Sequence, residues 1–181
     1  MAQVWVNARK AIKTAIEISR TGTLIRETSF CHDGEAFLLS IHQGRATAYW
    51  LLRTITGKAI GAGSSSVKSD HLGLSQSALL PAYRGRGLYQ AVIKAFLEVF
   101  QGVCSDNTKT MTEASTKSWT KIGGKLRTET SPPSKAIKEM FASLGRPAPK
   151  EISVSHYCLP GQNKRRVRQV TAKEICGSAL K

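Results

Sequence analysis

The stretch from Leu72 to Phe100 constrains the fold of this chain more than any other. A run of strand-forming residues, Leu72 to Leu80, ends at Pro81, and a glycine-rich turn, Tyr83 to Gly87, follows at once. Behind the turn, apolar residues recur at steps of three and four, the spacing of one helix face. They are Leu88, Ala91, Val92, Ala95, Phe96, Val99 and Phe100. The sequence therefore predicts a unit of strand, glycine turn and helix.

The residues before this unit predict one helix and several strands. Residues 8–20 have the amphipathic spacing of a helix, with a basic outer face and Asn7 as its cap. Short strand-like runs around residues 24–25, 35–41 and 45–52 favour an antiparallel meander. The Gly/Ser-rich segment 56–66 is open to two interpretations, a mobile loop or a strand that another backbone approaches closely.

The residues after the unit predict further short elements. We expect strands at 110–115 and 125–130, with a short helix at 116–122 between them. A helix opens at Pro132-Pro133-Ser134, and a last strand covers 151–159. The length of 181 residues suits one domain, 1–159, with a helical insertion at about 132–145, followed by a basic tail, 160–181.

The chain is strongly basic, which predicts acidic partners. Its 27 Lys and Arg residues outnumber 12 acidic residues, a formal charge of +15. The tail holds six basic residues and one acidic residue, so most of the excess lies in the body. No apolar run approaches the roughly 20 residues that span a bilayer, and the start, Met1 to Trp5, lacks a signal pattern. We therefore expect a cytoplasmic protein that does not bind membranes.

The four cysteines, at positions 31, 104, 158 and 176, are widely separated and form no CxxC pair. This spacing argues against a disulfide scaffold and against a zinc ribbon. Cys31-His32 and His156-Cys158 would make a metal site if they met, but nothing in the sequence brings them together. We expect no metal.

The glycine turn has the chemistry of an anion site. A strand that passes through a glycine turn into a helix presents free backbone N–H groups and the positive end of the helix dipole at one point. Arg84 and Arg86 add charge, while Gly85 and Gly87 let a phosphate approach the backbone. A pyrophosphate is the natural ligand of such a turn.

Two segments resemble the GNAT (GCN5-related) N-acetyltransferase superfamily. The segment Leu79 to Leu88 (LLPAYRGRGL) resembles its acetyl-CoA loop, Q/R-x-x-G-x-G/A. Arg84 and Gly87 match the first and fourth positions, and Tyr89 stands where the family has Gly or Ala. The segment Ser118 to Gly124 (SWTKIGG) is similar to the family's L-Y-x-K-x-G-F, with Trp119 in place of the tyrosine that often acts as general acid.

This resemblance implies a mixed α/β (α+β) fold, a central twisted mixed sheet flanked by helices, splayed where the pantetheine arm of acetyl-CoA lies. It implies oxyanion stabilisation by backbone N–H groups near Ala78 to Leu80 and direct attack of a neutral amine on the thioester. The cofactor-binding residues that it implies are Leu79, Leu80, Arg84, Gly85, Arg86, Gly87, Leu88 and Tyr89.

The base that deprotonates the amine has three candidates: Glu113 on the expected strand 110–115, His71 and Glu35. Glu113 leads them. A proton for the departing thiolate has four candidate donors in place of the missing tyrosine. They are Ser115, Ser118, Tyr83 and Tyr89. The alternative is protonation by water, because the CoA thiolate is a good leaving group. The indole N–H of Trp119 is too weak an acid to donate this proton.

Two functions follow. The first is acetyl-CoA-dependent transfer to an amine on an acidic or nucleic-acid-associated acceptor, such as aminoacyl-tRNA, a nucleobase or a protein in a nucleic-acid assembly. The alternative is a catalytically degenerate GNAT-fold protein that acts as a nucleic-acid-binding or assembly module. Its phosphate clamp would be Lys164, Arg165, Arg166 and Arg168, which otherwise form a solvated tail.

Both functions predict salt-dependent binding to a polyanion. If the protein contacts about four phosphates, its affinity for a generic oligonucleotide should fall about 100-fold between roughly 50 and 200 mM salt, because bound cations are released. Fluorescence anisotropy across this range measures the slope. An affinity that hardly changes with salt would remove the polyanion partner.

Overall fold

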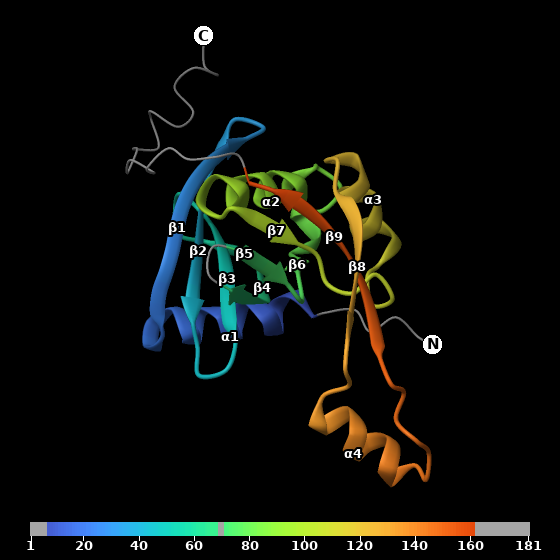
Figure 1. Ribbon diagram of the computed structural model, residues 1–181. Coiled ribbons are helices and arrows are strands. Elements are labelled where there is room, and N and C mark those ends of the chain that lie inside the picture. Colours follow the sequence, from blue (N-terminus) through green and yellow to red (C-terminus); the bar gives the residue numbers. More distant parts are fainter. Residues whose placement is uncertain (1–6, 69–70, 162–181) are drawn as a thin grey trace.

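A nine-stranded mixed sheet forms the centre of the computed structural model, which describes residues 7–68 and 71–161 (Figure 1). The sheet order is β1-β2-β3-β4-β5-β7-β9-β8, and β6 pairs with β4 beside this path. Most pairs are antiparallel, and β5 with β7 is parallel. Helices flank the sheet, so the predicted mixed α/β fold class is confirmed.

The first half is a helix followed by an antiparallel meander, as predicted. Helix α1 (Ala8–Thr21) begins at Asn7, whose side chain accepts a hydrogen bond from the Lys10 N–H at 3.2 Å. The meander that follows consists of β1 (Thr23–His32), β2 (Glu35–Gln43), β3 (Ala48–Thr54) and β4 (Ala59–Lys68).

The Gly/Ser-rich segment is a strand that another backbone approaches closely. It forms β4, and a Cβ atom added at Gly63 would overlap the backbone oxygen of Gln76 and the indole nitrogen of Trp50. A Cβ atom at Gly61 would overlap the Leu79 side chain. Glycine at these two positions lets residues 76–79 lie against β4.

The strand, glycine turn and helix are present, but the strand is interrupted. It consists of β5 (His71–Leu74) and β6 (Ala78–Leu79), followed by the short helical turn η1 (Pro81–Tyr83), helix α2 (Leu88–Val99) and β7 (Gly102–Cys104). Between β5 and β6, the N–H groups of Ser75 and Gln76 both point at the Ser64 carbonyl oxygen, at 3.0 and 3.3 Å.

The strand expected at 110–115 is wrong. Thr112 instead caps helix α3 (Glu113–Lys121), and its hydroxyl accepts the Ser115 N–H at 3.2 Å. Glu113 therefore begins a helix, where a carboxylate near the N-terminal end of the dipole is stabilising. The strand that pairs with β5 is the three-residue β7, which is too short to show a pattern in the sequence.

The last strands form a long hairpin that carries a helix at its end. Strand β8 (Lys125–Ser131) pairs antiparallel with β9 (Ile152–Pro160). Helix α4 (Lys135–Ser143) lies between them, capped by Ser134, where the insertion was predicted. Figure 1 shows α4 extending away from the sheet. The division into a domain and a tail stays a prediction, and residues 162–181 lie outside the described part.

The two helices that cover the sheet pack on opposite faces. Helix α2 places Val92, Ile93 and Phe96 in the main core, with Trp50 and Val103 of the sheet. Helix α1 packs Ile12 and Ala15 against Leu51 and Ala62 in a second cluster. Helix α1 contacts β2, β3, β4 and β6, so within the described part of the chain it leaves the same face of β5, β7 and β9 open. No helix in the described ranges is long and apolar enough to cross a bilayer.

The expectation against disulfides is wrong, since Cys104 and Cys158 are bonded to each other. They are direct partners on the antiparallel strands β7 and β9, although 54 residues separate them in the sequence. Cys31 is also disulfide-bonded. Sequence spacing did not reveal the 104–158 pair because only the strand order places these residues side by side.

Substitution of Gly63 tests the close approach onto β4. Gly63→Ala should lower the free energy of unfolding by about 1–3 kcal/mol, because its Cβ would meet backbone that cannot rotate away. Gly73→Ala is the matched control, also within a strand, where the Cβ would meet only the rotatable Ser66 hydroxyl. Urea unfolding of both variants measures the difference; equal losses would contradict the packing described here.

Candidate functional site

The glycine turn leaves a row of backbone N–H groups without acceptors. Gly85 and Gly87 have φ values of +76° and +74°, in the left-handed region that glycine adopts without strain. Gly87 is the N-cap residue of α2 and makes no side-chain cap bond. Among the described residues, the N–H groups of 85–89 donate to no acceptor. The turn therefore presents donors and the positive end of the α2 dipole to solvent.

Two cavities lie beside this turn. One, of about 530 Å³, extends over Gly85, Gly87 and the first turns of α3. The other, of about 270 Å³, lies between residues 74–79 and α3. The residues that line both are Ser77, Ala78, Leu79, Arg84, Tyr89, Thr112 and Ser115. Because they share these walls, the two cavities adjoin. Together they form one channel, which leads from the turn to the end of β6.

Leu79 directs its backbone polar groups toward these cavities. The Leu80 N–H donates to the Ile60 carbonyl of β4 at 2.8 Å. Polar groups of successive residues in an antiparallel pair point to opposite sides, so the Leu79 N–H points away from β4. The Leu79 carbonyl accepts the Arg84 Nε–H at 2.8 Å on that side. Leu80 itself faces α1 and lines another cavity, of about 420 Å³.

The two arginines of the turn have different surroundings. Arg84 lines both cavities beside the turn. Arg86 turns toward the loop between β1 and β2, where its Nη2 lies 3.6 Å from Asp33 Oδ2. The Arg86 carbonyl accepts a hydrogen bond from His32 Nε2 at 2.7 Å. Arg84 is thus the side chain of this pair that faces the cavities.

Tyr89 places a phenol between the two sides of the channel. Its hydroxyl donates to Ser77 Oγ at 3.2 Å. Burial raises the pKa of Tyr89 above its ordinary value of 10.0, although the hydrogen bond with Ser77 opposes that rise. The phenol therefore stays protonated at neutral pH. Trp119, which lines the 270 Å³ cavity, is fully buried in the main core.

The predicted catalytic residues do not lie together. Ser115 lines both cavities, but Glu113 is exposed on α3 and lines neither. Its carboxylate lies 2.6 Å from Lys117 Nζ, and the hydrogen bond to Lys117 lowers the pKa of Glu113. His71 begins β5 and lines a third cavity on the other face of the sheet. Glu35 is exposed at the start of β2.

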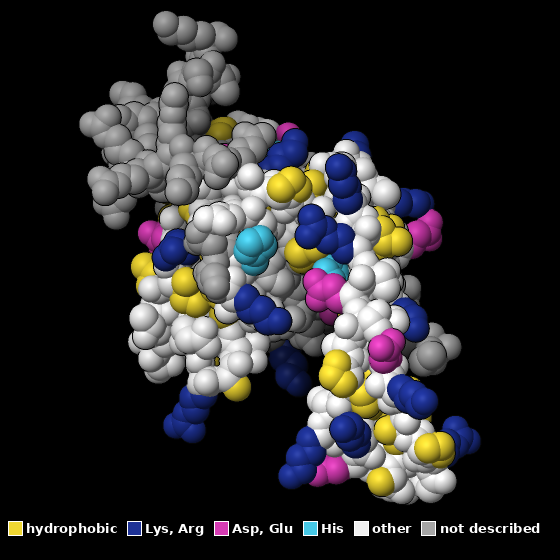
Figure 2. Space-filling view, in the orientation of Figure 1, with side chains coloured by type: hydrophobic (Ala, Val, Ile, Leu, Met, Phe, Trp, Pro, Cys, Tyr) yellow, Lys and Arg dark blue, Asp and Glu magenta, His cyan; other side chains and the backbone are white. Residues whose placement is uncertain are grey.

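The third cavity, of about 740 Å³, lies on the face that α1 leaves open. Gly73 and Ser105 line this cavity. The next residues along the chain, Leu74 and Asp106, line the 270 Å³ cavity. The two cavities thus lie on opposite faces where β5 and β7 part. Figure 2 shows histidine, basic and acidic side chains gathered around a hollow on this face.

Sequence reasoning missed Arg127 and Glu129 of this third cavity, and it considered His156 only as a metal ligand that nothing brings to its partners. They lie on β8 and β9, which reach β5 only through β7 in the strand order. The His156-Cys158 pair was the one available signal, and its partner is Cys104 rather than Cys31. The predicted clamp residues, Lys164, Arg165, Arg166 and Arg168, lie outside the described residues.

No protein-family model and no curated protein matches this chain. Its fold is similar to that of the ribosomal-protein-S18-alanine N-acetyltransferase from Escherichia coli, with a TM-score of 0.41 and 16% identity over 71% of this chain and 77% of that one. It is also similar to nourseothricin acetyltransferase, with a TM-score of 0.40 and 12% identity over 83% and 93% of the two chains. Both of those proteins are acetyltransferases.

Proposed function

We propose that this protein is a GNAT-type N-acetyltransferase, which transfers the acetyl group of acetyl-CoA to an amine. The row of unpaired N–H groups at residues 85–89 carries this proposal, because it opens onto the channel that leads to Leu79 and Tyr89. A pyrophosphate fits such a row, since each donor gains an acceptor and the α2 dipole favours negative charge. Acetyl-CoA would supply the activated acetyl thioester.

Leu79 and Arg84 have different proposed roles in the channel. The Leu79 N–H, directed into the channel, polarises the carbonyl of the group to be transferred, as in an oxyanion hole. Arg84 is held by the Leu79 carbonyl and brings positive charge close to the turn. Arg86, engaged with Asp33, orders the turn through the loop between β1 and β2.

Tyr89 takes the place of the missing general acid. Its hydroxyl lies in the channel between Ser77 and Ser115, and it is protonated at neutral pH. A thiolate that leaves beside it receives the phenol proton. Ser115 is the proposed positioning residue, because it lines both cavities together with Tyr89 and Ser77. A tyrosine from α2 thus serves where the family uses one from the helix that here carries Trp119.

The amine enters from the other face of the sheet. The 740 Å³ cavity reaches the gap between β5 and β7 from that face, and His71 in its wall is the proposed base. His71 is proposed in preference to Glu113, because the Glu113 side chain is exposed on α3 and lines none of the three cavities. Lys68 and Arg127 also line this cavity, which supports an acceptor that carries negative charge, in line with the net charge of +15.

The second candidate is the catalytically degenerate module. One observation favours it: Trp119 is buried in the core, where the family has its acid. Such a protein would bind the cofactor at the turn but would not catalyse acetyl transfer.

For either function we propose the cytoplasm as the location. Thiols are kept reduced there, so Cys104 and Cys158 would be present as thiols.

Calorimetric titration with acetyl-CoA tests the cofactor turn. We expect one saturable site, weakened on the order of 10- to 100-fold by Gly87→Glu, whose carboxylate repels the pyrophosphate at the N–H row. Gly145→Glu is the matched control, because Gly145 also has positive φ, +64°, and open space around it, far from the turn. Equal affinities of both variants and the wild type would place the cofactor elsewhere.

Turnover of Tyr89→Phe tests the proposed acid. The kcat should fall on the order of 100-fold with the KM for acetyl-CoA little changed, because the phenol acts only as the thiolate leaves. CoA release is measured with a panel of primary amines that includes aminoacyl-tRNA. Tyr83→Phe, in the wall of the 530 Å³ cavity, is the control and should retain full activity.

The same assay separates the two candidate functions. Saturable acetyl-CoA binding with no turnover on any amine supports the degenerate module. Turnover that Tyr89→Phe leaves unchanged contradicts the role of Tyr89 while leaving acetyl transfer in place.

A further inference from the structure

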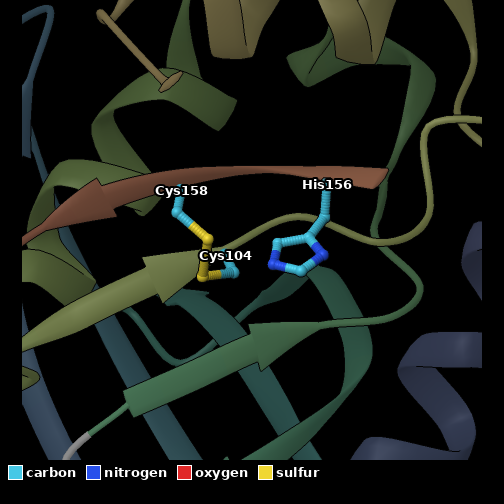
Figure 3. A group of neighbouring side chains, drawn as sticks. All are labelled: Cys104, His156 and Cys158. Atoms are coloured by element: carbon cyan, nitrogen blue, oxygen red, sulfur yellow. A yellow bond between two sulfur atoms is a disulfide. The ribbon is translucent and has the colours of Figure 1, made fainter. Parts of the chain in front are cut away.

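Three metal-ligating side chains meet on the open face of the sheet. The ligand atoms of Cys104, His156 and Cys158 all lie within 4.8 Å of one another (Figure 3). Nothing in the proposed acetyl transfer uses them. We propose that the protein, once its Cys104–Cys158 disulfide is reduced, binds one zinc ion through these two thiolates and the His156 imidazole.

Two strands of the central sheet hold the three ligands in place. Cys104 on β7 and Cys158 on β9 are direct register partners, so their side chains project from the same face. His156 lies two residues before Cys158, and strand alternation puts it on that face too. Figure 3 shows the imidazole beside the two sulfurs, with one ring nitrogen on their side. The site is thus largely preformed by the backbone.

The donor set suits zinc. Zinc prefers tetrahedral coordination by thiolate and imidazole, with bonds of about 2.3 Å to sulfur and about 2.0 Å to nitrogen. Ligand atoms in such a tetrahedron lie about 3.5 Å apart. Rotation of the thiol groups and of the ring brings the three atoms from within 4.8 Å to that spacing. Two thiolates also neutralise the charge of the ion.

The surroundings of His156 support a role as ligand. Glu129 Oε1 lies 3.5 Å from His156 Nε2. A carboxylate beside the imidazole adds negative charge next to the three ligands, which favours a cation there. Arg127 and Lys68 line the same cavity, and positive charge near a thiol favours the thiolate. The 740 Å³ cavity gives the ion access and leaves room for a water as fourth ligand.

The disulfide and the zinc site are alternative states of the same two sulfurs. A water-soluble phosphine reduces the disulfide: it takes one oxygen from water and becomes the phosphine oxide, while the sulfurs gain two electrons and two protons. Zinc then displaces both thiol protons as the two Zn–S bonds form. The oxidised protein therefore lacks the site, and the affinity of the reduced protein for zinc rises with pH.

Cobalt(II) substitution tests this proposal in full-length protein. The background carries Cys31→Ser and Cys176→Ser, so that Cys104 and Cys158 are the remaining cysteines. After reduction with the phosphine, we expect one equivalent of Co²⁺ to bind with a thiolate-to-cobalt charge-transfer band in the near ultraviolet. Zn²⁺ should abolish the band stoichiometrically. The same protein before reduction should show no band.

Single substitutions assign the ligands. Cys104→Ser, Cys158→Ser and His156→Ala should each weaken Co²⁺ binding by at least about 100-fold. His71→Ala, in the same cavity but outside the three, is the matched control and should bind as the background does. Circular dichroism checks the fold of each variant, and His156→Ala keeps both cysteines should a cysteine variant fail to fold.

Three results would overturn the proposal. The first is the absence of a charge-transfer band in the reduced background protein, which would leave the disulfide as the sole role of the pair. The second is unchanged Co²⁺ affinity in His156→Ala, and the third is a lost band in His71→Ala, since either of these places the metal on other ligands. These measurements need no acetyl-CoA and no acceptor, so they do not depend on the proposed enzyme activity.

Discussion

The candidate site depends on a gap in the sheet, where β5 and β7 separate. Beyond that point the chain after β5 stays hydrogen-bonded to β4, and the chain after β7 stays hydrogen-bonded to β9. On one side, Ser75 and Gln76 both direct their N–H groups at the Ser64 carbonyl, so the chain stays against β4 and continues into β6. On the other side, Ser105 keeps to β9, since its N–H donates to the Tyr157 carbonyl at 2.7 Å. The gap between the two halves is therefore a result of backbone hydrogen bonding. It leaves the Leu79 N–H without a strand partner beside the channel.

Glycine contributes to this arrangement in two physically different ways. In β4, Gly61 and Gly63 allow residues 76–79 to approach the strand, which a Cβ would prevent. In the turn, Gly85 and Gly87 adopt positive φ values, which aim successive N–H groups at one point. The glycines of β4 allow residues 76–79 to form one wall of the channel. The glycines of the turn lie at its entrance.

The two faces of the sheet at the gap carry different chemistry. The face covered by α2 has the N–H row, Arg84 and the Tyr89 phenol, all suited to an anionic thioester. The face left open by α1 has His71, His156 and the Cys104–Cys158 pair in one cavity. A zinc ion there would join β7 to β9 under reducing conditions, as the disulfide does under oxidising ones. The ion would then lie in the wall of the proposed amine cavity.

The sequence by itself determined the local elements: α1 with its Asn7 cap, α4 with its Ser134 cap, and the strand, glycine turn and helix that form the proposed anion site. Periodicity and capping act over a few residues, so they can be recognised in a single sequence. The tertiary structure alone decided that β7 lies between β5 and β9, and that Cys104 faces Cys158 and His156. Strand order depends on contacts between residues some 50 positions apart, as the 54-residue separation of Cys104 and Cys158 shows, and no local pattern encodes them.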